Sequence, residues 1–293
     1  MAGIPARLAE YAHYTDERLI ENLPQPQGPD ARLVEAMRYS VMAGGKRFRP
    51  YLVFRSAEIC GADREVAVHA ACAVECLHTY SLIHDDLPAM DDDELRRGKP
   101  TCHVQFDEAT AILAGDALLT YAFELLVSAD IPDTAKVNCV RSLATRSGYA
   151  GMVGGQMADT VAENHEPDSL LMDYIHSHKT GDLITCSCEL GAFCAGATEQ
   201  QFNSLRQFGR YCGLAFQVSD DICDHISTSE EMGKEVGKDD DAGKQNAVRV
   251  HGMAKARQIV TDSAQKASEA LKSFGNGAED LRQLVSWLRE RRS

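Results

Sequence analysis

The sequence lacks an excess of positive charge and lacks paired cysteine motifs. Lysine and arginine number 30 against 44 aspartates and glutamates, a formal net charge of −14 in 293 residues. So acidic a chain is a poor general ligand for nucleic acid or an anionic membrane surface, and we expect no nucleic-acid partner. The ten cysteines form no C-x-x-C pair, so zinc and dithiol motifs are not indicated. We interpret them as buried thiols of a protein in a reducing cytoplasm.

Long apolar runs and a leader pattern are missing as well. Residues 1–10 contain no apolar stretch typical of a secretory signal. No run of about 18 apolar residues without a charge occurs anywhere. The sequence therefore predicts a cytoplasmic protein without stable membrane insertion. Hydrophobic residues still make up 44% of the chain, which allows a large core.

Proline is absent after Pro167, although the chain has nine prolines in all. Long uninterrupted helices are therefore allowed in the second half. Apolar residues recur at helical spacing almost throughout, as at Leu33, Met37 and Val41, whereas alternating strand patterns are missing. One long helix is predicted from Arg64 to Leu87, ended by Pro88. We expect an all-α fold in which residues 1–293 form a single domain, a bundle of about ten helices.

Two dense acidic clusters each follow an apolar helical stretch. The first contains Asp85, Asp86 and Asp91, and the second contains Asp220, Asp221 and Asp224. Crowded carboxylates repel one another, so a cluster of this kind favours nearby cations. Mg²⁺ fits best, since proteins usually hold it with one or two carboxylates plus substrate phosphates.

Other acidic motifs explain the first cluster less well. An EF-hand loop counted from Asp91 would need glycine at its sixth position, where Arg96 stands. The His84-Asp85 pair is typical of metal-dependent phosphohydrolases. That chemistry would need further histidine ligands, which could come from His69, His78, His176 or His178. It stays open as a weaker alternative.

Basic segments accompany the acidic ones. Arg96 and Arg97 directly follow the first cluster, and residues 44–50 (GGKRFRP) join a helix end to a helix start. A helix N-terminus beside cations is a good anion site. His78 lies seven residues before Asp85, hence on the same helix face. Metals and arginines side by side favour a phosphate-rich ligand.

A third group of candidates lies in the second half. Lys179 and Thr180 interrupt a predicted helix, with Gly181 supplying local freedom. Gln217 precedes Asp220 and Asp221 by three and four residues and faces the same way.

Together these motifs resemble the trans-isoprenyl diphosphate synthases, most closely the bacterial farnesyl diphosphate synthases. The resemblance covers nearly the whole chain. Its strongest parts are LIHDDLPAMDDDELRRGKPT (82–101), GDALL (115–119), GGQMAD (154–159), HKTGDL (178–183) and FQVSDDICD (216–224). It implies an isoprenoid synthase helical bundle around a central cavity, with the two acidic motifs facing each other across its mouth.

The resemblance also assigns roles to residues. It implies about three Mg²⁺ ions, with Mn²⁺ as an alternative, held on an allylic diphosphate by Asp85, Asp86, Asp91, Asp220, Asp221 and Asp224. Arg96, Lys179 and Lys234 would add positive charge to that diphosphate. Lys46, Arg49, His78 and Arg97 would bind isopentenyl diphosphate without metal. Thr180 and Gln217 would line the gap between the substrates, where Lys179 also acts in catalysis.

Product length is expected to depend on Tyr80, five residues before Asp85, because a bulky aromatic there closes the tunnel after a C15 product in related synthases. Ser81 beside it is too small to do so. One departure follows Gly243-Lys244, where the family usually has a Ser/Thr-x-Tyr-Pro-like stretch and this chain has Gln245-Asn246-Ala247-Val248. The contacts of that loop and the role of Lys244 are therefore open.

The resemblance implies a Mg²⁺-dependent prenyltransferase that condenses isopentenyl diphosphate with dimethylallyl or geranyl diphosphate to make farnesyl diphosphate. Alternatives are a geranylgeranyl diphosphate synthase, a class I terpene cyclase without the second diphosphate site, and an inactive partner subunit. A homodimer is expected from the family, although no stripe of the sequence identifies an interface.

Overall fold

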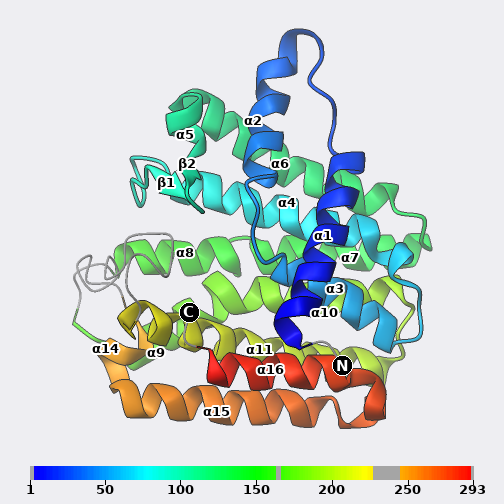
Figure 1. The fold of residues 1–293 in the computed structure, drawn as a ribbon, viewed down its shortest axis with the longest axis vertical. Helices are drawn as coiled ribbons and strands as arrows, with labels where there is room; N and C mark the ends of the chain where they lie inside the picture. Colours follow the sequence, from blue (N-terminus) through cyan, green and yellow to red (C-terminus); the bar gives the residue numbers. More distant parts are fainter. Residues whose placement is uncertain (1–2, 163–165, 227–244, 292–293) are drawn as a thin grey trace.

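The structure, a computed structural model, describes residues 3–162, 166–226 and 245–291, and its regular elements are almost all helical (Figure 1). In chain order they are α1 (Ile4–Asn22), η1 (Gly28–Asp30), α2 (Ala31–Val41), α3 (Phe48–Ile59), η2 (Arg64–Ala67), α4 (Val68–Asp85), β1 (Leu95–Arg96), β2 (Lys99–Pro100), α5 (Cys102–Gln105), α6 (Glu108–Ser128), α7 (Asp133–Ser147), α8 (Met152–Val161), α9 (Ser169–Ile175), η3 (His176–Gly181), α10 (Asp182–Cys194), α11 (Glu199–Ile226), α14 (Ala247–His251), α15 (Met253–Ala270), η4 (Lys272–Ala278) and α16 (Glu279–Glu290). The expected all-α class is confirmed.

The centre of the bundle is α10, of which every residue except Phe193 is buried. Apart from Asp182 and Glu189 its sequence is apolar or small, and a helix of that kind needs neighbours all round. It packs against α3, α7 and α11, while α4 packs against α6 and α11 against α15. In Figure 1 the helices cross the view in successive layers, from α4 and α6 through α8 and α10 to α11, α16 and α15.

Two helical segments in the described part of the chain have the length and hydropathy of a membrane span. They are Arg64–Asp85 and Glu108–Ser128. Of the 18 most apolar consecutive residues in each, 72% are buried in the first segment and 39% in the second. A core helix passes the same test, and the first segment lies inside the bundle. On α6, Ile112, Leu113 and Val127 are exposed.

Two local expectations need correction. The helix predicted from Arg64 to Leu87 begins with a 3₁₀ turn and ends at Asp85, because the residue before a proline avoids the helical region. A short antiparallel hairpin, β1–β2, was not predicted. Its turn residues, Arg97 and Gly98, have φ of 55° and 74°, as a tight hairpin turn requires. The Arg-Gly pair is a weak signal for such a turn because arginine seldom adopts positive φ.

Candidate functional site

The first acidic cluster lies at the C-terminal end of α4. Asp85 is the last helical residue, Asp86 caps the helix, and the Asp91 N–H donates to the Asp85 carbonyl at 2.9 Å. Burial raises the pKa of Asp85 to about 6, although the Lys179 ammonium lowers it. A carboxyl with so raised a pKa lacks enough positive charge around it, which fits a site that receives a cation.

Arg96 is bound to this cluster. Its Nε donates to Asp86 Oδ1 at 2.7 Å, and its Nη2 lies 3.3 Å from Asp93 Oδ2. Burial raises the pKa of Asp86, and the hydrogen bond from Arg96 opposes that rise. Arg96 therefore lies beside the first acidic cluster, with its guanidinium on the carboxylates of Asp86 and Asp93.

The second acidic cluster lies near the end of α11, and its members differ. Asp221 Oδ1 accepts a hydrogen bond from Gln217 Nε2 at 2.9 Å, and its Oδ2 accepts one from the Ala247 N–H at 2.7 Å. His176 Nε2 lies 3.3 Å from the same Oδ2. Asp220 is more open, with a 37% exposed side chain that lies 3.2 Å from Arg291 Nη1. Asp221 is thus held by protein donors on both oxygens.

No group of three or more His, Cys, Asp or Glu side chains among the described residues is arranged to hold a metal ion alone. Mg²⁺ is commonly bound by one or two carboxylates and completed by substrate phosphates. The two clusters therefore fit ions that bind together with a diphosphate.

Lys179 and Thr180 lie in η3, a π-helical turn between α9 and α10. The predicted interruption of the helix is confirmed, and π turns are frequent at functional sites. Lys179 Nζ donates to Asp159 Oδ2 on α8 at 2.6 Å, and Thr180 Oγ1 donates to Gln217 Oε1 on α11 at 2.6 Å. A hydrogen-bonded chain thus runs from Thr180 through Gln217 to Asp221.

Helices α8 and α11 approach the π turn through glycines. A Cβ built on Gly155 would lie 2.2 Å from the Lys179 backbone nitrogen, and one on Gly213 would lie 2.8 Å from the Gly181 Cα. Only glycine allows such close backbone contact. One cavity is lined by Asp159, Ile175, His176, Lys179, Thr180, Gln217, Asp221, Gln245 and Asn246.

The residues predicted to bind a diphosphate without metal include two guanidiniums, those of Arg49 and Arg97, close to His78. Burial lowers the pKa of Arg49 to about 10, with Arg97 adding to the decrease. Burial, then Arg49 and Arg97, hold the pKa of His78 well below its usual value. The buried Nε of Arg49 has no hydrogen-bond partner. Cations that repel one another and a donor without an acceptor both favour an anionic ligand.

The two basic loops meet here. The Arg97 guanidinium donates to the Gly44 carbonyl. Burial and Arg291 lower the pKa of Lys46, while Asp220 raises it, so Lys46 lies near the second acidic cluster. Arg47 has another role, since its buried side chain pairs with Glu75 at 2.7 Å and Asp16 at 2.8 Å.

The chain-length residues lie on α4. Tyr80 is 7% exposed, and its ring stands edge-on to His84 with centroids 5.6 Å apart. Ser81 Oγ donates to the His78 carbonyl at 2.8 Å.

The atypical loop packs next to the second cluster. Gln245 Oε1 accepts from the Asp168 N–H at 3.0 Å, Asn246 Oδ1 caps α14 by accepting from the Arg249 N–H at 2.8 Å, and Ala247 contacts Asp221. Lys234 and Lys244 lie outside the described residues.

Sequence reasoning missed three neighbours of the site. The sequence assigns no role to Asp159 or Arg291, and it offers His176 only as a possible histidine ligand of a phosphohydrolase. The GGQMAD motif could have indicated Asp159, but Arg291 reaches Asp220 from the position directly after α16, which no local pattern signals.

The sequence matches the polyprenyl synthetase family over residues 30–287. It is 45% identical over 248 residues to farnesyl diphosphate synthase of Haemophilus influenzae, a match that covers 84% of each chain. It is 46% identical over 243 residues to geranylgeranyl pyrophosphate synthase 4 of Arabidopsis thaliana, covering 82% of this chain and 65% of that one. Among solved structures, the geranyltransferase from Helicobacter pylori complexed with magnesium and isoprenyl diphosphate superposes with a TM-score of 0.88 at 32% identity, covering 99% of each chain.

Proposed function

The chain belongs to the polyprenyl synthetase family and is a trans-prenyltransferase, and we propose that its product is farnesyl diphosphate. Its substrates would be isopentenyl diphosphate and, as starters, dimethylallyl or geranyl diphosphate. The observation that carries the two-substrate part of this proposal is the pair of guanidiniums of Arg49 and Arg97 close to His78, which supply positive charge in addition to Arg96 and Lys179 at the acidic clusters. A class I cyclase would have no use for a second anion site.

The acidic clusters would hold Mg²⁺ with the allylic diphosphate. Asp85, Asp86 and Asp91 on one side and Asp220, Asp221 and Asp224 on the other supply the oxygen ligands, for about three ions. The ions, when bound, would neutralise the charge that builds on the leaving diphosphate. Because both Asp221 oxygens accept protein hydrogen bonds, Asp221 would also position Gln217.

The remaining residues would bind and orient the two substrates. Lys179 and Arg96 place positive charge at the leaving diphosphate, and Lys234 would join them. Arg49, Arg97, His78 and Lys46 hold isopentenyl diphosphate so that its double bond lies against the allylic carbon. The Thr180–Gln217 pair would lie between the two sites and shield the cation formed there. The leaving diphosphate is the natural acceptor for the final proton.

The proposed C15 product length rests on Tyr80. At about 1.5 Å per residue, five residues separate Tyr80 from Asp85 by roughly 7.5 Å along α4. The side chain is buried at 7% exposure, as expected for a residue that closes the end of an apolar tunnel. The relatives leave C15 and C20 open, since farnesyl and geranylgeranyl synthases match at similar identity.

Purified protein incubated with geranyl and isopentenyl diphosphates, with and without Mg²⁺, tests the proposal. We expect a Mg²⁺-dependent C15 product, measured by chromatography of the dephosphorylated alcohols. A C20 product would make the protein a geranylgeranyl synthase, a cyclic hydrocarbon from one substrate would make it a cyclase, and no turnover would favour a partner subunit.

A matched pair of variants tests the role of Tyr80. Tyr80→Ala should shift the product from C15 to C20 or longer, whereas Tyr80→Phe keeps the ring and should keep C15. A C15 product from both variants would assign the tunnel floor to another residue.

Assembly and location remain proposals as well. Exposed apolar side chains on α6 (Ile112, Leu113) and α8 (Val153, Met157) support a homodimer, which light scattering would test. A cytoplasmic location stays a prediction from the sequence.

A further inference from the structure

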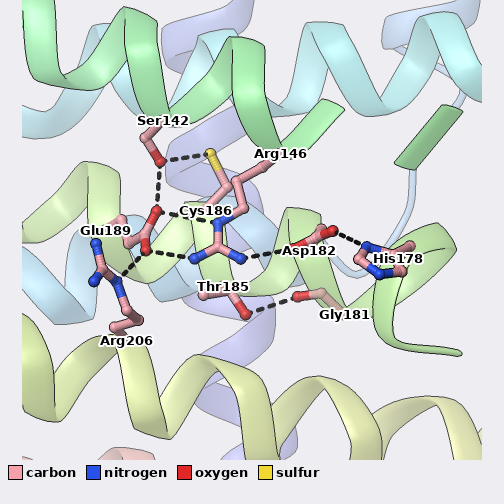
Figure 2. A network of polar contacts seen from close by, with 9 residues as sticks. All are labelled: Ser142, Arg146, His178, Gly181, Asp182, Thr185, Cys186, Glu189 and Arg206. Carbon is pink, nitrogen blue, oxygen red and sulfur yellow. Dashed lines mark hydrogen bonds and ion pairs between the residues drawn. The ribbon is translucent and has the colours of Figure 1, made fainter. Parts of the chain in front are cut away.

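A buried polar network links three helices to the π turn (Figure 2). Its centre is Glu189 on α10, which is 3% exposed. Glu189 accepts hydrogen bonds from Ser142 Oγ at 2.6 Å, Arg146 Nη2 at 2.8 Å and Arg206 Nε at 2.7 Å. These donors come from α7 and α11. Burial opposes ionisation of Glu189, but the hydrogen bonds from Arg146 and Ser142 outweigh it and lower its pKa.

An arm of the network extends toward Lys179 and Thr180. Arg146 Nη1 donates to Asp182 Oδ1 at 2.6 Å, and Asp182 Oδ2 lies 2.7 Å from His178 Nδ1. Asp182 is the first residue of α10, directly after the π turn, and His178 lies inside that turn. Figure 2 shows the continuous chain from Arg206 to His178.

The two parts of the network are separable. Glu189 and its three donors tie α7, α10 and α11 together away from the π turn. The Asp182–His178 pair contributes little to the packing of these three helices, because Arg146 keeps its contacts with Glu189 without that pair. A π turn is rare and occurs mostly as a single-turn insertion in an α-helix, so contacts from its surroundings must favour it over the regular α-helix. The arm supplies such a constraint one residue before Lys179.

We propose that His178, held by Asp182 and Arg146, is a positioning residue that fixes the π turn and thereby sets the placement of Lys179 and Thr180. This inference rests on the proposed function, which assigns those two residues to the reaction.

The test compares His178→Ala with His178→Asn. Both lose the ring contact with Tyr174, whose centroid is 4.3 Å away, but the Asn side-chain N–H can replace Nδ1 as the donor to Asp182. We expect kcat with geranyl diphosphate to fall about 10- to 100-fold in His178→Ala and to stay within about threefold in His178→Asn. KM for isopentenyl diphosphate should change less than twofold in both, because its cations lie on other elements.

Arg206→Gln is the control for a purely structural role. It replaces the charged donor to Glu189 at the far end of the network with a shorter, neutral one, so it should lower Tm without changing kcat. Equal kcat values for His178→Ala and His178→Asn would overturn the inference, as would a loss of kcat in Arg206→Gln as large as that in His178→Ala.

A second readout does not need turnover. The rate at which an amine-reactive reagent labels Lys179, followed by mass spectrometry, should rise at least threefold in His178→Ala over His178→Asn. Identical labelling in the two variants would contradict the inference. Absence of product from the wild-type protein would instead contradict the proposed function. In that case the labelling rates alone would test whether His178 fixes the position of Lys179.

Discussion

Gly155→Ala tests whether the contact between α8 and the π turn is as close as described. The added Cβ would lie 2.2 Å from the Lys179 nitrogen and 2.8 Å from its Cα, where an ordinary contact begins at 3.4 Å. The two backbones must therefore move apart by about 1.2 Å, which is the difference between an ordinary contact of 3.4 Å and the 2.2 Å from the added Cβ to the Lys179 nitrogen. Neither atom belongs to a flexible side chain, so rotation of a side chain cannot relieve the clash.

Both stability and rate should respond. Overpacking of this kind costs about 1–3 kcal/mol, which lowers Tm by about 2–10 °C in a protein of this size. The same displacement moves Lys179 relative to Asp159, now 2.6 Å from it, and a misplacement of about 1 Å can reduce the rate about 100-fold. We expect kcat to fall by that order while circular dichroism still reports a helical protein.

Gly277→Ala is the matched control, because a Cβ at Gly277 meets nothing within 4 Å and its φ is ordinary. It should leave kcat unchanged and Tm unchanged or slightly raised. Scanning calorimetry and steady-state kinetics on both variants decide the matter. A Gly155→Ala protein with wild-type Tm and kcat would refute the close approach of α8 to Lys179.

Three further outcomes are expected. Asp220→Ala should reduce turnover at least about 1,000-fold with little change in Tm, because it removes a predicted metal ligand without removing core packing; near-normal turnover would remove Asp220 from the site. Arg97→Ala should raise KM for isopentenyl diphosphate about tenfold or more, and KM for geranyl diphosphate far less; equal increases would argue against two separate diphosphate sites. Burial raises the pKa of Asp85 from 3.8 to about 6, so its protonated form stabilises the fold below pH 4 and that contribution is lost as pH rises through 6. Tm measured in EDTA should therefore fall over that range less steeply in Asp85→Asn than in the wild type, and added Mg²⁺ should raise Tm of the wild type most above pH 6; identical slopes would contradict the raised pKa.

The sequence predicted those parts of the site that depend on local pattern. Asp85 lies at the end of an apolar helix. Lys179 lies in a different helical stretch, at the point where its helical pattern is interrupted. Both positions could be inferred from the spacing of residues alone. The pairing of Gln217 with Asp221 follows from their separation of four residues on one helix.

Contacts between distant segments could not be predicted in this way. Arg291 at Asp220, the Ala247 N–H on Asp221 and the donors around Glu189 each join elements far apart in the chain. Such pairs are determined by the packing of the whole bundle. The sequence pattern around a charged helical residue is the same whether its side chain faces solvent or a buried partner. The Arg97-Gly98 hairpin was missed for another reason, because arginine is uncommon at positive φ.

The left-handed backbone of Arg97 has a consequence for protein engineering. An L-residue with a φ of 55° is less stable there than glycine by about 1 kcal/mol, and repulsion from the Arg47 and Arg96 guanidiniums adds to the cost. A library selected only for heat tolerance should therefore enrich glycine or asparagine at position 97. Those clones would be more stable and, if Arg97 binds isopentenyl diphosphate as proposed, would bind that substrate more weakly. Thermal evolution of this scaffold thus needs a catalytic screen in every round.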